Sequence, residues 1–383
     1  MQDTVKNTEY EKRTIKIGVL FSQSGPMAIS ESSHLRGVLL ACEEVNNNGG
    51  IAGQKLEPII LDPAGDDLLY AKMATELLLK HRVNIIFGCC LSSSRKAVLP
   101  IIERFNGILF YPSVYEGFEY SPNVIYGGGV PNQLVLPLLK YIFNNYGKNI
   151  ALIGLDYLYP REINRVVTEF LNASGGKVVA EKYLNFSADA ADLRLNLNDI
   201  LKNKPDVIFS TVVGLDSINL YSVYAELEFD GVKPPLASLT AVESSIQALE
   251  LDKREGHISV ASYFSSLETD ANKAFIKKFK ARFGEKTSPC VFSEVAYSLV
   301  NVFANALLSA KYDDTESILA ALSEASIESP GGDLFLDLDT NHLTLRPYVA
   351  KSNREGSYDI LWESPSVIKA DPYLIAYDRS IEV

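Results

Sequence analysis

The stretch IKIGVLFSQSG, residues 15–25, sets the pattern that the rest of the chain follows. Its first seven residues are mostly apolar and rich in β-branched side chains, which is typical of a buried strand, and the Ser-Gln-Ser-Gly that follows predicts a loop. Residues 31–47 then have helical spacing and stop at Asn-Gly-Gly, where glycine tolerates the conformation that ends helices. The order of strand, loop and helix indicates a parallel α/β sheet covered by helices.

The same order continues to residue 111 and then recurs from residue 149. In the first set we expect strands at 54–61, 83–88 and 107–111 and helices at 68–81 and 93–105. In the second set we expect strands at 149–154, 177–183, 206–213 and 236–238 and helices at 161–173, 193–203 and 217–228. The repeat predicts two doubly wound parallel-sheet lobes of similar design.

The last third of the chain predicts a return to the first lobe. A strand at 257–263 is followed by helices at 270–283, 289–310 and 315–325, and then by strands at 332–338, 343–351 and 358–362. We therefore assign residues 14–129 plus 263–328 to an N-terminal lobe and 130–262 plus 329–383 to a C-terminal lobe, and we read Gly127–Gly129 as a crossing segment. Several crossings make a hinge, with a cleft between the lobes.

Composition excludes some classes of function. The chain has 383 residues, which fits about two domains, and its formal charge of −12 disfavours direct contact with nucleic acid. No segment is long and apolar enough to predict a membrane span. The first fourteen residues are polar and charged, so we expect a cytoplasmic protein, with the periplasm as the alternative if a signal peptide was removed. The four cysteines lack a CxxC pair and predict buried free thiols.

The candidate site is a set of loops that follow the predicted strands, because ligands of parallel α/β sheets lie at the carboxyl ends of strands. These loops are rich in hydroxyl and phenol groups, which suit a small, neutral, polar ligand. Two other interpretations stay open: Ser92, Ser93 and Ser94 are also good helix caps, and the tyrosines are also good packing residues. The loop residues concerned are Ser22, Ser24, Ser92, Ser93, Ser94, Tyr111, Ser113, Tyr115, Tyr157, Tyr159 and Thr240.

Catalytic patterns are sparse. None of the four histidines has a second His or Cys at metal-ligand spacing, and neither a GxSxG elbow nor a phosphate-binding loop is present. Cys89 or Cys90 would need a neighbouring base to act as a nucleophile, and the sequence indicates none. We therefore expect a protein that is not an enzyme and needs no metal or cofactor.

Several long blocks carry a resemblance to a known family. GCCLSSSRKAVLPIIER (88–104), GLDYLYPREINR (154–165) and PPLASLTAVE (234–243) resemble the amide-binding and urea-binding branch of the type I periplasmic-binding-protein family, as do further blocks from about Ile15 to Tyr377. Within this branch the chain is most similar to amide sensors that negatively regulate amidase expression. The resemblance implies a type I periplasmic-binding-protein fold with a short amide or urea held between the lobes.

The resemblance also implies site residues, matched position by position. Ser92 corresponds to the loop that grips the amide, Tyr111 and Ser113 to the next loop, Tyr157 and Tyr159 to tyrosines that close from the other lobe, and Thr240 to a further hydroxyl contact. Cys90 replaces an aromatic residue of the family and Ser113 replaces a threonine, so both are expected to widen the ligand space, and Val114 replaces a proline.

The function implied by the resemblance has two main forms. In the first, an amide sensor controls amidase expression by contacting an RNA-binding antiterminator protein. In the second, the chain is the substrate-binding component of an ABC importer for amide or urea and docks on its permease. A remote third form is an amide-hydrolysing enzyme. Self-association through lobe helices is typical of the family, so a homo-oligomer is also left open.

Overall fold

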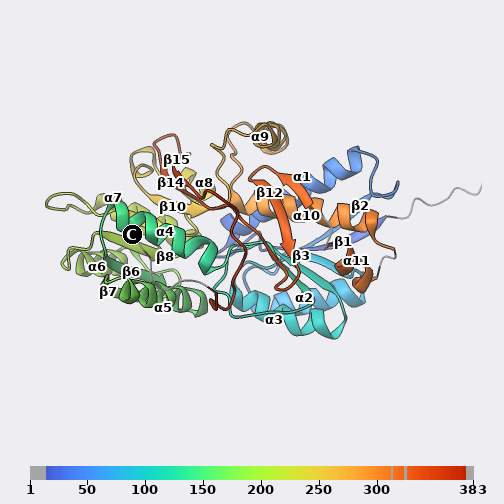
Figure 1. Cartoon of the computed structure of the whole chain (residues 1–383), viewed down its shortest axis with the longest axis horizontal. Helices are drawn as coiled ribbons and strands as arrows, with labels where there is room; N and C mark the ends of the chain where they lie inside the picture. Colours follow the sequence, from blue (N-terminus) through green and yellow to red (C-terminus); the bar gives the residue numbers. More distant parts are fainter. Residues whose placement is uncertain (1–13, 312–313, 323–325, 377–383) are drawn as a thin grey trace, which may run out of the picture.

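The protein consists of two α/β lobes joined by several chain crossings, as the computed structural model in Figure 1 shows. The structure describes residues 14–311, 314–322 and 326–376. The first lobe is built around an eight-stranded sheet and the second around a seven-stranded sheet. The two lobes of mostly parallel sheet that the sequence predicts are therefore present.

The first sheet has a parallel centre and antiparallel strands at one edge. Its parallel strands bury continuous apolar runs such as the fully buried Ile85–Gly88, as expected when helices cover both faces. In spatial order the strands are β11 (Ser326–Ser329), β12 (Gly332–Asp337), β13 (His342–Leu343), β5 (Val124–Tyr126), β4 (Ile108–Tyr111), β3 (Ile85–Gly88), β1 (Ile15–Leu20) and β2 (Leu56–Leu61).

The second sheet repeats this plan. Its five central strands pair in parallel, and two later strands add to the edge in antiparallel pairs. In spatial order the strands are β15 (Tyr358–Glu363), β14 (Tyr348–Ser352), β10 (Ile258–Ala261), β9 (Leu236–Ser238), β8 (Val207–Thr211), β6 (Asn149–Leu155) and β7 (Lys177–Leu184).

The helices cover the sheets, and several of them begin at the loops that form the cleft. They are α1 (Ala28–Asn47), α2 (Asp67–Leu79), α3 (Ser92–Arg104), α4 (Pro131–Asn145), α5 (Leu158–Ala173), α6 (Ala190–Leu201), α7 (Gly214–Glu226), α8 (Glu243–Gln247), α9 (Asp270–Phe283), α10 (Val291–Ser309) and α11 (Thr315–Leu322), with a 3-10 turn at Leu251–Lys253. Helices α1 and α10 cross closely at Gly37, where an added Cβ would lie 2.1 Å from the Ser293 carbonyl oxygen.

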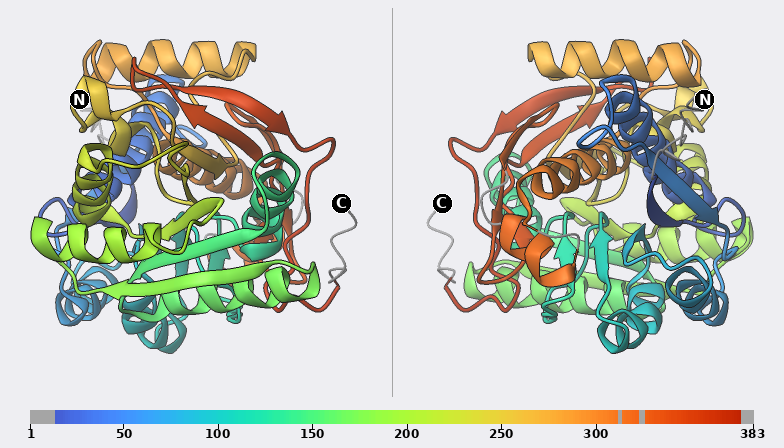
Figure 2. Two further views of the ribbon diagram at one scale, coloured as in Figure 1. Left: turned by 90° about the vertical axis from the view of Figure 1, so that its left-hand side faces the viewer. Right: turned by 90° about the vertical axis from the view of Figure 1, so that its right-hand side faces the viewer.

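The chain crosses between the sheets three times: after β5, after β10 and after β13. Figure 2 looks at the molecule from each end and shows the orange and red C-terminal segments running alongside both lobes. The third crossing differs from our assignment, because β12 and β13 belong to the first sheet although we placed residues 329–383 in the C-terminal lobe. The single strand predicted at 343–351 is two strands in different sheets, with Arg346-Pro347 between them.

Four elements escape the sequence analysis. It does not predict the short strands β5 and β11, the short helix α8 or the helix α4, whose sequence PNQLVLPLLKYIFNN contains two prolines. Pro131 occupies the first turn, where its missing N–H costs nothing, but Pro137 lies inside the helix and hides the helical pattern.

Helix α10 corrects the expectation that no segment is long and apolar enough to span a membrane. Its 19 residues are sufficient in length and composition to cross a membrane, but 72% of that window is buried inside the protein, as in the core helix of a folded domain. The cysteines agree with the sequence analysis: Cys42, Cys89, Cys90 and Cys290 are all buried and free.

Candidate ligand-binding site

A cavity lies between the two lobes, where loops at the carboxyl ends of strands from both sheets meet. It encloses about 370 Å³ of empty space including its opening, of which the centres of water molecules can reach about 30 Å³. Space of this size suits a molecule of a few heavy atoms rather than a drug-sized ligand. The lining residues are Met27, Ser30, Cys90, Leu91, Ser92, Ser113, Val114, Tyr157, Tyr159, Val213, Thr240 and Phe292.

The structure brings together seven of the eight residues proposed from the sequence. Cys90, Ser92, Ser113, Val114, Tyr157, Tyr159 and Thr240 all line the cavity.

Tyr111 is the exception, because it is fully buried beneath the cavity wall and does not line it. Its hydroxyl donates a hydrogen bond to the carbonyl oxygen of Cys90 at 2.7 Å. Its place in the structure is therefore behind the wall, as a support for the backbone at Cys90.

Three helices point their N-termini at the cavity. Leu91, Tyr157 and Val213 are the residues that precede α3, α5 and α7, and all three line the cavity. Within the described chain, none of these three helices has a side-chain cap, so the interpretation of Ser92–Ser94 as caps is wrong. Free amide groups and the positive ends of three helix dipoles suit an oxygen acceptor on the ligand, either a carbonyl or a carboxylate.

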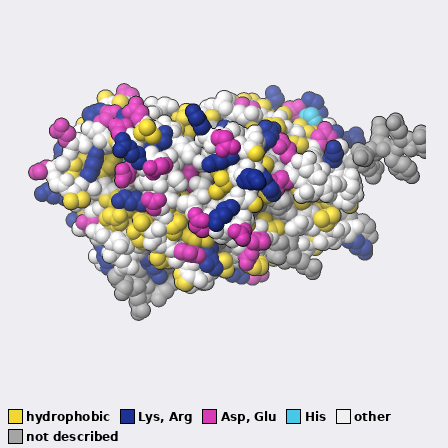
Figure 3. Space-filling model, turned by 90° about the horizontal axis from the view of Figure 1, so that it is seen from above, with side chains coloured by type: hydrophobic (Ala, Val, Ile, Leu, Met, Phe, Trp, Pro, Cys, Tyr) yellow, Lys and Arg dark blue, Asp and Glu magenta, His cyan; other side chains and the backbone are white. Residues whose placement is uncertain are grey.

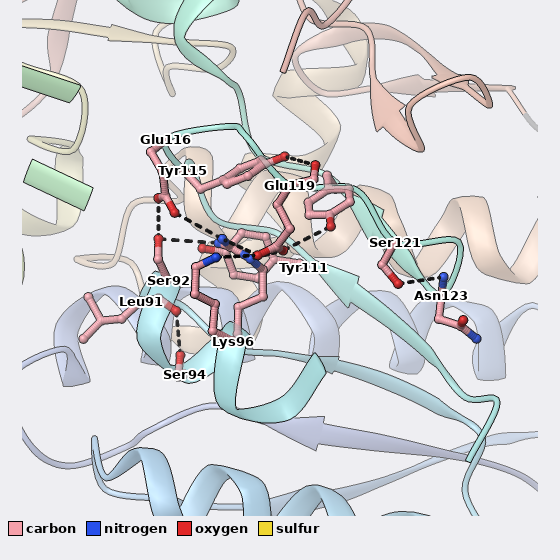
Figure 4. Close-up of polar contacts among 12 residues, drawn as sticks. Leu91, Ser92, Ser94, Lys96, Tyr111, Tyr115, Glu116, Glu119, Ser121 and Asn123 are labelled. Atoms are coloured by element: carbon pink, nitrogen blue, oxygen red, sulfur yellow. Dashed lines mark hydrogen bonds and ion pairs between the residues drawn. The ribbon is translucent and has the colours of Figure 1, made fainter. Parts of the chain in front are cut away.

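The hydroxyl of Ser92 is held by a buried charge network, drawn in Figure 4. Ser92 donates to a carboxylate oxygen of Glu116 at 2.5 Å. The other oxygen of Glu116 pairs with Arg95 at 3.3 Å, and Arg95 pairs with Glu119 at 2.7 Å. The Ser92 oxygen also accepts a long hydrogen bond from Nη1 of Arg95 at 3.5 Å. Because its proton is donated to Glu116, the Ser92 oxygen offers the cavity its remaining lone pair as an acceptor and no donor.

Arg95 is the centre of this network, and it does not lie on the helix surface or between the lobes. Its side chain is fully buried and lies over the rings of Tyr111 and Tyr115, at 4.8 and 4.4 Å from their centroids. Both acidic partners and both tyrosines belong to the first lobe, so Arg95 is a fixed support for the wall and not a charge presented to the ligand.

Two further groups shape the polarity of the cavity. The hydroxyl of Tyr159 is buried and has no hydrogen-bond partner in the described part of the protein. Ser113 lies 3.4 Å from Nε2 of His34, and burial lowers the pKa of His34 to about 3, so this imidazole is neutral. Burial also raises the pKa of the Cys90 thiol well above its usual range, which leaves it protonated and a poor nucleophile.

Five lining residues were not among the proposed set: Met27, Ser30, Leu91, Val213 and Phe292. Val213 lies in the loop after β8, and Met27 and Ser30 lie just after the loop that follows β1, so the rule for parallel sheets could have found them. Phe292 comes from the start of α10, far along the chain, and no local signal marks it.

The resulting surface is polar but uncharged. Among the residues that the structure describes, no Asp, Glu, Lys, Arg or His side chain lines the cavity. An ammonium group would find no carboxylate there, and burying an unpaired charge is costly. A neutral group with one acceptor and two donors can pair with the helix amides, the Ser92 oxygen and the Tyr159 hydroxyl.

The lobes also touch beside the cavity. The amide of Leu215 at the start of α7 donates to the carbonyl oxygen of Pro26 in the first lobe at 3.0 Å. Arg165 of α5 lies 5.2 Å from the ring centroid of Phe118 in the first lobe. These contacts join loops that would separate if the lobes opened about the crossings, so the structure describes a closed arrangement.

A two-lobed fold with an enclosed interlobe cavity defines a solute-binding protein. The family model described as "Periplasmic binding protein domain" matches residues 15–379, and the chain belongs to this family. The family consists mostly of binding proteins rather than enzymes.

Curated relatives cover most of the chain. The leucine-, isoleucine-, valine-, threonine- and alanine-binding protein of Pseudomonas aeruginosa is 27% identical over 333 residues, which is 85% of this chain and 86% of the relative. Leu/Ile/Val-binding protein homolog 7 of Brucella abortus is 25% identical over 338 residues and 82% of each chain. A shorter match, 29% identical, covers 31% of this chain and 22% of a limonene hydroxylase from Geobacillus stearothermophilus.

Solved structures support the same fold. A solute-binding protein of an ABC transporter from R. palustris, in complex with 4-hydroxybenzoate, superposes with a TM-score of 0.82 at 20% identity, covering 95% of this chain and 100% of that one. The branched-chain amino acid binding protein LivJ from Streptococcus pneumoniae, in complex with isoleucine, gives a TM-score of 0.80 at 21% identity, covering 93% and 99%.

Proposed function

We propose that the chain is the solute receptor of an ABC importer and that its ligand is a short-chain carboxamide. The importer role, which was the alternative in the sequence analysis, is supported by the transporter context of the structural neighbours and by the binding proteins among the relatives. The amide ligand is supported by the cavity itself and by the resemblance of the sequence blocks.

The proposal that the ligand is a carboxamide rests mainly on the direction of the hydrogen bond made by the Ser92 hydroxyl. Its proton is donated to Glu116, so the oxygen can only accept a hydrogen bond from the ligand. A carboxamide offers an N–H to this oxygen and its carbonyl to the free amides at the helix N-termini. A carboxylate has no hydrogen-bond donor for the Ser92 oxygen. One of its oxygens would face the Ser92 oxygen, and the lone pairs of the two atoms would repel each other.

Charge also separates this chain from its amino-acid-binding relatives. The name of the Pseudomonas relative gives amino acids as its ligands, and an amino acid carries an ammonium group. Along the described cavity wall there is no acidic side chain to pair with such a group, since Glu116 lies behind Ser92 and is paired with Arg95. The proposed guest is therefore uncharged, which is also why urea belongs in the test.

The amide-sensor role remains the second candidate, carried by the resemblance alone. A sensor would act in the cytoplasm through an antiterminator partner, whereas an importer receptor would act in the periplasm through a permease. Fractionation of the native cells decides between these two locations, and recovery in the cytoplasm would contradict the importer role without affecting the ligand class.

Titration calorimetry with matched neutral and charged ligands tests the ligand class. The panel contains acetamide, propionamide, butyramide and urea, the carboxylates acetate, propionate and butyrate, and leucine and 4-hydroxybenzoate. We expect at least one carboxamide to bind about tenfold or more tightly than its matched carboxylate. Binding of leucine or 4-hydroxybenzoate without binding of any amide would contradict the proposal. Mass spectrometry of the incubated amide should show no hydrolysis, because the Cys90 thiol is protonated.

A further inference from the structure

A second, smaller cavity lies next to the ligand cavity, among the chain crossings. It contains about 290 Å³ of empty space, of which the centres of water-sized groups reach about 10 Å³. Its walls come from both lobes: from the segments after β4 and β5, from α4, from β10, from the loop after β9 and from the start of α10. The lining residues are Pro112, Val114, Gly128, Gly129, Leu134, Leu239, Val260, Ala261, Ser262, Val291, Phe292 and Val295.

This second cavity is apolar, in contrast to the first. In the described structure its side chains are aliphatic or aromatic, except for Ser262, and none is charged. A water molecule needs two to four polar partners to be stable in a cavity, and a small apolar space therefore tends to stay dry and to accept apolar groups. Its size fits one or two carbon atoms.

Val114 and Phe292 form the partition between the two cavities, since both residues line both spaces. Phe292 is buried and stacks at a tilt on His34, whereas Val114 is only partly buried. A ligand whose polar head lies against Ser92 and Tyr159 therefore has an apolar space available on the far side of this partition.

We propose that the second cavity is a subsite for the aliphatic tail of the ligand, so that the substrate class is a carboxamide with about three to five carbons rather than urea or formamide. This inference rests on the proposed function, because it takes the polar head to be in the first cavity. The tail passes Val114 and Phe292 and ends between Ala261 and Val295. Burial of each added methylene then strengthens binding until the space is full.

A chain-length series measured by calorimetry tests the subsite. For the wild-type protein, affinity should rise about fourfold per methylene from acetamide to butyramide and then level off or fall. The same series of carboxylates is measured in parallel, so that chain-length dependence is seen whichever head group binds.

Two variants change the subsite in opposite directions without touching the first cavity. Ala261→Val partly fills the space and should lower the affinity for butyramide about tenfold while leaving that for acetamide unchanged. Val295→Ala enlarges the space and should move the optimum to a longer chain by at least one carbon. Val300→Ala is the control, because Val300 is also fully buried on α10 but lines neither cavity.

The outcomes separate the subsite from the proposed function. If acetamide binds but affinity does not change with chain length, or if neither variant changes the length profile while both remain folded by circular dichroism, the subsite is wrong and the amide function stands. If Ala261→Val fails to fold, the shift in Val295→Ala decides alone. If neither the amides nor the carboxylates bind, both proposals are overturned.

Discussion

At Ser92, the proposed choice of ligand head group rests on the direction of one O–H bond. The proton is committed to Glu116, and Glu116 is fixed in turn by Arg95, which is buried between two carboxylates and two tyrosine rings. Charge-assisted hydrogen bonds of this kind are stronger than neutral ones, so the Ser92 hydroxyl is not free to turn toward a ligand. If Ser92 binds the ligand as proposed, the selectivity of the cavity depends on Glu116 and Arg95, which do not line it.

Replacing Glu116 by Gln should reverse the polarity of Ser92. The glutamine oxygen can still accept from Arg95, and its NH₂ group can donate to the Ser92 oxygen, which turns the serine proton toward the cavity. We expect the affinity ratio of propionate to propionamide to rise on the order of tenfold, measured by calorimetry. Glu119→Gln is the control, because Glu119 also pairs with Arg95 but does not contact Ser92; an equal change in both variants would contradict the role of Glu116.

Tyr159→Phe should separate binding from stability. Its hydroxyl is buried without a partner in the described structure, so its removal should leave the free energy of unfolding unchanged or raise it by up to about 1 kcal/mol. The same change should weaken amide binding by about 1 kcal/mol if the ligand pairs with this hydroxyl. Tyr224→Phe is the matched control: that hydroxyl donates to the Pro234 carbonyl, so stability should fall and affinity should not. Unchanged amide affinity in Tyr159→Phe would remove this hydroxyl from the site.

At the scale of elements, the uncapped N-termini of α3, α5 and α7 converge on one space from two lobes. Each helix has an apolar residue or a tyrosine where Ser, Thr, Asp or Asn would usually stand. By contrast, α2, α6 and α9 begin away from the cavity and have side-chain caps from Asp66, Asp189 and Thr269. The absence of caps leaves amide groups at the starts of α3 and α5 available to a ligand, whereas at α7 the Leu215 amide already donates to the Pro26 carbonyl oxygen.

Most of the elements could be predicted from the sequence, as could seven of the eight proposed site residues, which line the cavity. Five of the seven were expected from their places in strand-end loops, and Cys90 and Val114 from the family resemblance. Buried parallel strands can be recognised in the sequence as apolar runs, and the loops that follow them meet at one edge of a sheet. What escaped depends on long-range packing: Pro137 hides α4, the strands on either side of Pro347 join different sheets, and Phe292 reaches the site from α10. Tyr111 was expected to line the cavity but is buried behind its wall, because its position after a strand does not show how far its side chain lies from the cavity.

A buried carboxyl at the start of α8 makes stability depend on pH. Glu243 is fully buried; one of its oxygens accepts from the Ser265 amide in the second crossing, and the other has no partner in the described structure. Burial raises the pKa of Glu243 to about 7. The folded state thus holds this proton more tightly than the unfolded chain, so the favourable contribution is present below the ordinary pKa and is lost as pH rises toward 7.

Glu243→Gln removes this titration. The stability of the variant relative to the wild-type protein should therefore rise between pH 5 and pH 8, by about 1–3 kcal/mol in denaturant unfolding. Contributions from the buried histidines are common to both proteins and cancel in the difference. Glu250→Gln, at an exposed position, is the control. A difference between variant and wild type that is the same at both pH values would contradict the assignment of this titration to Glu243.

At the scale of the whole molecule, the net charge is −12. On the face seen in Figure 3, acidic side chains do not form one continuous patch but are interspersed with basic and apolar side chains. Docking of a partner on this face would therefore not be driven by net charge alone. In the proposed function, an open and a closed state would differ in the arrangement of the lobes. A ligand that contacts both lobes would favour the closed arrangement by its difference in affinity for the two states.

Gly214 is the position at which closure can be tested. Its φ of +61° suits glycine, and an added Cβ would lie 2.4 Å from the Pro26 carbonyl oxygen and 2.8 Å from the sulfur of Met27, both in the opposite lobe. Gly214→Ala should therefore hold the lobes apart, weaken amide binding at least about tenfold and keep the radius of gyration in small-angle X-ray scattering at its ligand-free value when amide is added. Gly175→Ala is the matched control, since Gly175 has a similar φ of +69° and no atom within 4 Å of an added Cβ, so that it carries the same backbone strain without the contact. If both variants bind amide equally well, the approach of α7 to Pro26 is not part of closure. Closure of the lobes would then depend on the contact of α5 with Phe118 instead.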